Sequence, residues 1–112
     1  LHALTLLNDE TFAEAARVLG ERLLGTPGND ASRVKRAFTL VLSRPPTGPE
    51  RTLLFSSLDR ARRHYRAHPE QVKAYATVGH HAPAVGLDPV EVAAWGAVAS
   101  LLLNSDEAIT RE

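Results

Sequence analysis

Apolar side chains recur at helical spacing along most of the chain, and clusters of proline and glycine separate these stretches from one another. Asn8 or Asp9 can cap a first helix that ends near Leu24. The apolar stripe of this helix consists of Phe12, Ala15, Ala16, Leu19 and Leu23. Gly20 within it costs up to about 1 kcal/mol relative to alanine, so we expect another helix to cross closely at this position.

A second helix is predicted after the turn at 25–29. It begins at Asn29 or Asp30 and ends near Leu42, where the sequence SRPPTG interrupts the pattern. One face of this helix is apolar and consists of Val34, Ala37, Phe38 and Val41. The short connection that follows favours an antiparallel arrangement with the next helix.

The third predicted helix begins at a capping box formed by Thr47 and Glu50 and runs to about Ala67. Its buried side is expected to contain Leu54, Leu58, Ala61 and Tyr65. Its opposite face carries Ser56, Asp59, Arg60, Arg63 and Arg66. A short fourth helix is predicted at 70–78, after a proline that suits a first helical turn.

The last predicted helix, within 88–107, differs from the others because it has no polar stripe. Asp88 can cap it, Pro89 suits its first position, and Glu91 stands where a capping box has its acidic residue. Its apolar residues cover every face: Val90, Val92, Ala93, Ala94, Trp95, Ala97, Val98, Ala99, Leu101, Leu102 and Leu103. Such a helix must be surrounded by the rest of the protein, so we expect Trp95 to belong to the core.

These patterns predict an all-α fold, a compact bundle of four to five helices around a buried apolar C-terminal helix. The β-branched residues are scattered, and no segment alternates as a strand does. The length suits a single domain, residues 1–112. Because the chain does not begin with methionine, we expect it to be an excised fragment or a processed product of a larger protein.

Composition removes several kinds of chemistry. The chain has no cysteine, which excludes disulfides, thiolate metal sites and covalently attached c-type haem in this chain. No apolar run is long enough to span a bilayer. The serines lack a nucleophile motif, and no glycine-rich phosphate loop is present. We therefore assign no catalytic, cofactor-binding or metal-binding residue.

Two groups of residues are nevertheless candidates for binding. His64 and His68 stand one helical turn apart and could form half of a metal site, with His80 or His81 as the nearest further ligands. The alternative, which we favour, is that the first two are partly buried polar residues and the last two are solvated in a loop.

The second candidate is a basic surface. The net charge is zero, but residues 33–66 hold nine basic side chains against Glu50 and Asp59. Arg60, Arg63 and Arg66 share one face and form an anion-binding candidate, with the basic residues at 33–36 expected nearby. Nucleic acid is the less favoured ligand because no aromatic residue stands among them. The alternative, which we favour, is a solvated face or a face that docks on acidic regions of a parent chain.

Several segments together resemble a planctomycete-specific domain of unknown function. These segments are ALTLLND (3–9) with AAR (15–17), SRPPTGPE (43–50) and DPVEVAAWGAVASLLLNSDEAITRE (88–112). The chain departs from that pattern at Ser105 and Ala108, where a larger apolar residue and an aromatic residue would be expected. The resemblance implies a C-terminal module of large proteins that carry an export signal and a cytochrome-c-like region. It implies haem c in the parent protein, an envelope or periplasm-like location, and no known catalytic residue.

Three functional hypotheses follow. The first is a non-catalytic structural or interaction module that contacts the preceding domains of its parent, and self-associates when its apolar opening segment 1–7 is exposed. The second is an enzyme site completed by the upstream region, with Asn8, Asp9, Asn104 and Asp106 as its polar candidates. The third is an anion-binding module that uses the arginine face described above.

Overall fold

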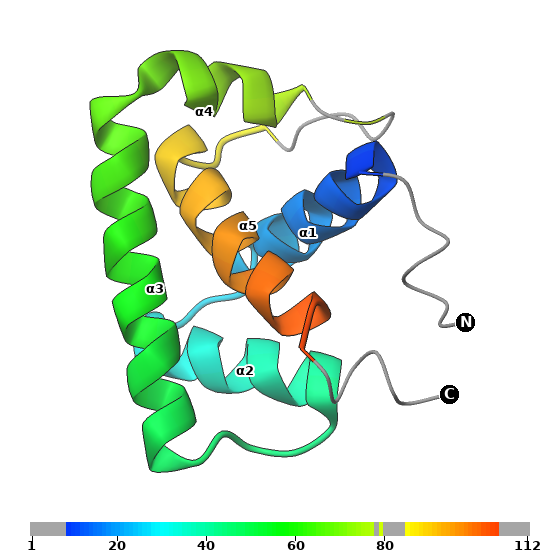
Figure 1. The fold of residues 1–112 in the computed structure, drawn as a ribbon, viewed down its shortest axis with the longest axis vertical. Helices are drawn as coiled ribbons and strands as arrows, with labels where there is room; N and C mark the ends of the chain where they lie inside the picture. The colour runs from blue at the N-terminus through cyan, green and yellow to red at the C-terminus, as the bar shows by residue number, and fades with distance from the viewer. Residues whose placement is uncertain (1–8, 78, 80–84, 106–112) are drawn as a thin grey trace.

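A computed structural model describes residues 9–77, 79 and 85–105 of the chain. Its helices are α1 (Asp9–Leu24), α2 (Asp30–Leu42), α3 (Gly48–Ala67), α4 (Pro69–Ala76) and α5 (Pro89–Leu103) (Figure 1). No strand occurs in this described part. The all-α prediction is therefore confirmed, and every predicted helix is present with ends close to those expected.

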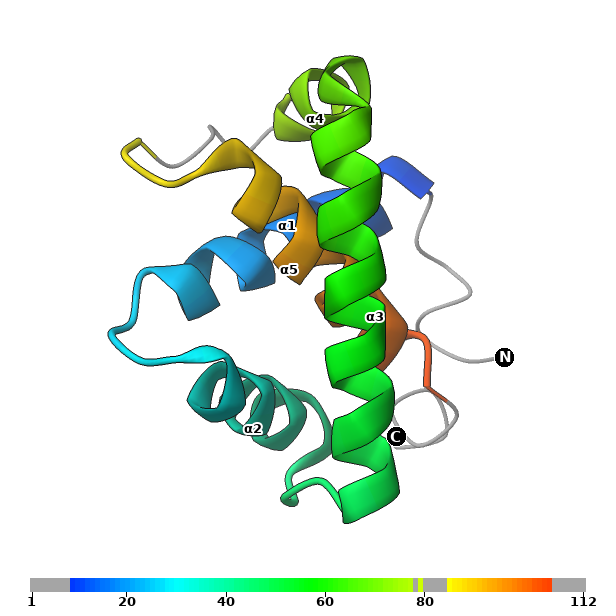
Figure 2. The ribbon, with the colours of Figure 1, turned by 90° about the vertical axis from the view of Figure 1, so that its left-hand side faces the viewer.

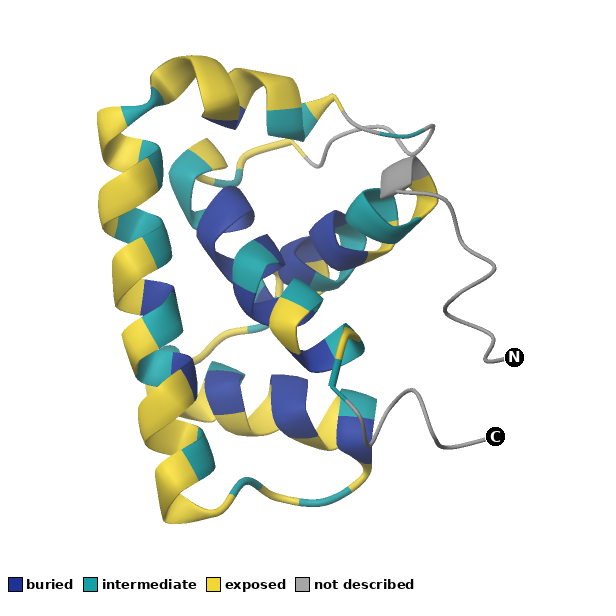
Figure 3. Cartoon of the chain, viewed as in Figure 1, coloured by how far each residue is buried: buried dark blue, intermediate teal, exposed yellow. Residues whose placement is uncertain are grey.

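Helix α5 lies at the centre and contacts each of the other four helices. Helix α1 crosses it, α3 runs along one side, and α4 and α2 lie near its two ends (Figures 1 and 2). Its buried residues are Val92, Ala93, Ala94, Trp95, Gly96, Val98, Ala99 and Leu102 (Figure 3). Trp95 has 0% of its surface exposed, which confirms its place in the core. Around it pack side chains from α1, α2 and α3, including Leu23, Phe38 and Leu58.

Two glycines allow the tight packing on α5. A Cβ atom at Gly20 of α1 would lie 2.9 Å from the backbone nitrogen of Gly96 and 3.2 Å from the carbonyl carbon of Trp95. The close helix crossing expected at Gly20 is thus confirmed. On another side of α5, a Cβ atom at Gly96 would overlap the hydroxyl of Tyr75 and lie 2.8 Å from its Cζ. The absence of these two side chains lets α1 and α4 approach the central helix.

The helix ends follow the capping rules. Asn29 caps α2 by accepting a hydrogen bond from the backbone nitrogen of Ser32 at 2.9 Å. Thr47 and Glu50 form the predicted capping box of α3, and Asp88 caps α5 by accepting from the Val90 backbone nitrogen. The expected capping role of Glu91 is wrong, because its carboxylate instead binds Arg62 of α3.

The expected antiparallel pairing of α2 and α3 is also wrong. The two helices cross steeply, with α2 horizontal and α3 vertical in Figure 1. Their connection contains Pro45 and Pro46, which bias the residues before them toward extended backbone. The linker is therefore extended and does not form the tight turn that an antiparallel helix pair needs. On α1, Ala15 is exposed and does not join the predicted apolar stripe.

None of the described helices has both the length and the apolar character that crossing a bilayer requires.

The glycine contacts predict how alanine substitutions change stability. We expect Gly20→Ala to lower the free energy of unfolding by about 1–3 kcal/mol, because the added methyl group meets the α5 backbone. Gly96→Ala should cost less, since the Tyr75 side chain can move aside. Gly48→Ala is the matched control, because no atom lies within 4 Å of its Cβ position. Urea unfolding measures all three variants, and equal stability of Gly20→Ala and Gly48→Ala would contradict the crossing.

Candidate functional site

The histidine pair lies at the junction of α3 and α4. The rings of His64 and His68 stack with centroids 4.4 Å apart. His64 Nε2 lies 2.6 Å from Gln71 Oε1, and His68 Nδ1 donates to the His64 carbonyl oxygen at 2.7 Å. In the part of the chain that the structure covers, no three His, Cys, Asp or Glu side chains form a group that could hold a metal ion. His68 is half-buried as expected, whereas His64 is exposed, so the expected partial burial is wrong for His64. His80 and His81 lie outside the described residues.

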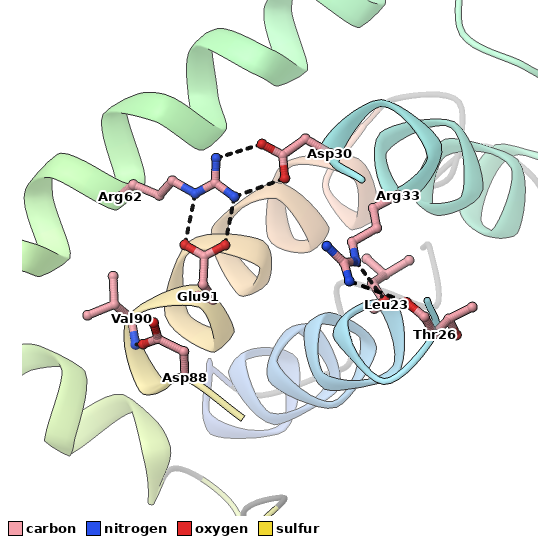
Figure 4. Close-up of polar contacts among 8 residues, drawn as sticks. All are labelled: Leu23, Thr26, Asp30, Arg33, Arg62, Asp88, Val90 and Glu91. Carbon is pink, nitrogen blue, oxygen red and sulfur yellow. Dashed lines mark hydrogen bonds and ion pairs between the residues drawn. The ribbon is translucent and has the colours of Figure 1, made fainter. Parts of the chain in front are cut away.

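The basic residues between positions 33 and 66 do not form one surface. Arg60, Arg63 and Arg66 are exposed on α3 as expected, and Arg63 pairs with Asp59 on the same helix. Arg33 instead folds back on the end of α1 (Figure 4). Its Nε donates to the Leu23 carbonyl oxygen at 3.2 Å, and its Nη2 donates to the Thr26 carbonyl oxygen at 3.4 Å. Arg33 thus satisfies carbonyl groups that a helix end leaves open.

Arg62 of α3 joins the first turns of α2 and α5 (Figure 4). Its guanidinium donates to both oxygens of Asp30, at 2.8 and 3.0 Å, and to both oxygens of Glu91, at 2.8 and 2.6 Å. The Arg62 side chain is only 20% exposed. The two carboxylates also lie at helix N-termini, where the helix dipole favours negative charge. We call these three residues the Arg62 clamp.

Hydrogen bonding within the Arg62 clamp favours the charged forms of Asp30 and Arg62. The hydrogen bond from Arg62 lowers the pKa of Asp30, although partial burial of Asp30 opposes this effect. The hydrogen bonds that Arg62 donates, to Asp30 first and to Glu91 second, raise the pKa of Arg62. In the sequence, Arg62 stands only as one of nine basic residues at 33–66. Its position one turn after the buried Leu58 was the feature that could have placed it on the inner side of α3.

A second ion pair fixes the linker between α2 and α3. Arg44 donates to both carboxylate oxygens of Glu50, at 2.9 and 2.8 Å, and its guanidinium lies 4.9 Å from the ring centroid of Phe38. Glu50 also accepts from the Thr47 backbone nitrogen at 2.8 Å. The hydrogen bond from Arg44 is the main cause that lowers the pKa of Glu50 to about 2. The linker is therefore tied both to α2 and to the first turn of α3.

A third polar group is buried where α1, α4 and α5 meet. Arg17 is fully buried and Glu21 is 8% exposed, with Nη1 and Oε2 2.8 Å apart. Burial raises the pKa of the nearby Tyr75. A cavity of about 90 Å³ adjoins them and is lined by Glu21, Val72, Tyr75, Ala76, Leu87, Pro89 and Val92. The charges of Arg17 and Glu21 neutralise each other, so we interpret this group as an ion pair that is buried in the packing of the helices. Arg17 belongs to the family-like AAR segment (15–17), but neither Arg17 nor Glu21 was predicted to be buried.

Asn104 is the one residue of the enzyme hypothesis whose side chain the structure describes. Its Nδ2 donates to the Ser100 carbonyl oxygen at 3.1 Å, next to the end of α5. Asn8 and Asp106 lie outside the described residues, and the side chain of Asp9 is not described. The Asn104 backbone nitrogen donates to the same carbonyl oxygen at 3.0 Å, so the side chain adds a second hydrogen bond at the C-terminal end of α5.

A surface groove of about 490 Å³ lies beside α2. Its lining residues come from α2, from the linker and from the first turn of α3: Asn29, Ala31, Ser32, Lys35, Pro45, Pro46 and Arg51. A depression of about 150 Å³ lies next to it and shares Ser32, with Thr26, Pro27, Arg33 and Arg36 as its other lining residues. The groove combines two cations with apolar proline rings. Sequence analysis did not name Arg51 or the prolines as site residues.

The Arg62 clamp predicts a loss of stability when Arg62 is removed. We expect Arg62→Ala to lower the free energy of unfolding by about 1–3 kcal/mol, between the values for exposed and buried ion pairs. Arg62→Lys should recover only part of this loss, because an ammonium cannot bind two carboxylates in the same paired geometry. Arg60→Ala on the exposed face is the control and should change stability by less than about 0.5 kcal/mol. Urea unfolding measures the series, and similar losses for positions 60 and 62 would disprove the role of the clamp.

The lowered carboxyl pKa values predict how stability depends on pH. In the unfolded chain Glu50 has its ordinary pKa near 4.5, whereas in the folded protein the value is about 2. As the pH falls through this interval, Glu50 takes up a proton in the unfolded chain before it does so in the folded protein. The stability that the Glu50 carboxylate gives the folded protein is therefore fully present above the ordinary pKa and is lost as the pH falls toward the folded-state pKa. Glu50→Gln should therefore make the decline of the urea midpoint below about pH 5 less steep. Identical pH profiles of both proteins would contradict the assignment.

Comparison with known proteins gives a family and no function. No curated protein and no solved structure matches the chain. The family model PSD1, described as "Protein of unknown function (DUF1553)", matches residues 1–58, which is just over half of the chain. The chain therefore belongs to the PSD1 (DUF1553) family.

Proposed function

We propose that this chain is a non-catalytic helical module that supplies packing or interaction surface within a larger, envelope-associated protein. Its partners would be the preceding domains of that protein. The resemblance to C-terminal modules of planctomycete proteins with a cytochrome-c-like region supports this context. Any haem c would be attached elsewhere in the parent, because this chain has no cysteine.

The observation that carries the proposal is that some basic side chains bind within the fold whereas others line a surface groove. Arg62, Arg44 and Arg33 hold helices and helix ends together through hydrogen bonds of 2.6–3.4 Å. Lys35 and Arg51, in contrast, line an open groove on the surface. A rigid helical frame that presents such a groove suits binding to another part of a protein.

Hydrogen exchange tests the proposal. We expect the backbone amides of α2 and of the first turn of α3 to exchange at least about tenfold more slowly in the intact gene product than in the isolated 112-residue chain, since a docked surface opens less often. The backbone amides of Arg60 and Arg66 in α3 serve as the internal reference. Equal exchange rates over the whole chain in both samples would count against an interaction module.

A further inference from the structure

We propose that the groove beside α2 binds an extended, acidic segment of a partner polypeptide, with Lys35 and Arg51 pairing with two of its carboxylates. This inference rests on the proposed function and deepens it, because it names the chemistry of the partner. The occupant is inferred from charge complementarity and from the shape and stiffness of the groove.

The charge argument starts from the groove lining. Lys35 of α2 and Arg51 of α3 are both exposed and line the same volume of about 490 Å³. The carboxylates next to the lining in sequence are already paired, Asp30 with Arg62 and Glu50 with Arg44. The neighbouring depression adds Arg36. The groove therefore has a positive potential that carboxylates of a partner can neutralise.

The walls of the groove are held in place before any partner arrives. Proline fixes the backbone φ angle at Pro45 and Pro46, and the Arg44–Glu50 pair ties the linker to α3. On the other wall, Asn29 and Ser32 form a reciprocal capping box. A groove with walls that are already ordered loses little conformational entropy on binding. Its volume also lies within the range of about 300–1,000 Å³ that is usual for ligand sites.

The apolar part of the lining favours a peptide over a nucleic acid. Ala31, Pro45 and Pro46 offer apolar contacts to a side chain that stands between two acidic residues. Nucleic-acid grooves instead use a row of phosphate contacts and aromatic rings on which bases stack. The lining of this groove has two cations and no aromatic ring. An extended peptide in which two acidic residues flank an apolar residue matches both the two cations and the apolar lining of the groove.

Peptide selection tests the inference on the 112-residue chain. A random dodecapeptide display library is selected on the immobilised chain and depleted against the Lys35→Gln/Arg51→Gln variant, whose helix content is first checked by circular dichroism. We expect the enriched peptides to carry at least two Asp or Glu residues that flank an apolar residue. No enrichment, or enriched peptides without acidic residues, overturns the proposal.

Affinity of an enriched peptide then locates the site. By fluorescence anisotropy, we expect Lys35→Gln/Arg51→Gln to weaken binding about tenfold, as the loss of two partly exposed ion pairs implies. Arg60→Gln/Arg66→Gln removes the same charge from another face and should leave the affinity within about twofold. Equal weakening by both double variants, or equally tight binding of an octathymidylate strand, overturns the proposal. If the peptide experiments fail but α2 still exchanges more slowly in the intact product, the acidic-peptide proposal is wrong and the interaction module is still supported. The two proposals can therefore be distinguished.

Discussion

The absence of a polar stripe on α5 is the constraint from which the rest of the structure follows. Apolar side chains in contact with water raise the free energy of the folded state, so almost every side of such a helix must be covered. Leu101, near the end of α5, is an exception, with 40% of its surface exposed. Four helices share this task, each with one apolar face of its own, and they therefore cross α5 in different directions (Figures 1 and 2). Gly20 and Gly96 remove the side chains that would hold α1 and α4 away. A small core of alanine, valine and leucine is sufficient because these backbones come close.

Apolar burial alone does not fix the directions of the covering helices, since it depends on area and not on orientation. Hydrogen-bonded ion pairs do depend on geometry. Arg62 requires the first turns of α2 and α5 to lie on the same side of α3, and Arg44 requires the linker to return to the start of α3. Ion pairs of this kind contribute little net stability after desolvation, but a wrong arrangement would leave their charges unpaired. We infer that they select the crossing pattern among alternatives that bury similar area.

The sequence predicts the parts of this fold that depend on neighbours along the chain. Caps at Asn29, Thr47 and Asp88 are local, and so the helix starts were predictable. The central position of α5 also follows from its own residues. The steep crossing of α2 and α3 and the partners of Arg62 could not be predicted, because they depend on which helices meet in space. Glu91 shows the difference: its position fits a capping box, yet the nearby guanidinium offers its carboxylate two stronger, charge-assisted hydrogen bonds.

The crossing also explains why the groove exists. Lys35 lies on an exposed face of α2. Because the helices cross, only the linker returns beside α2, below it in Figure 1, and it places Pro45 and Pro46 opposite this face. Two proline rings fill less space than a helix, so a volume of about 490 Å³ stays open with Arg51 at its border. The proline pair of the family-like SRPPTGPE segment thus both disfavours the tight hairpin and forms a wall of the groove.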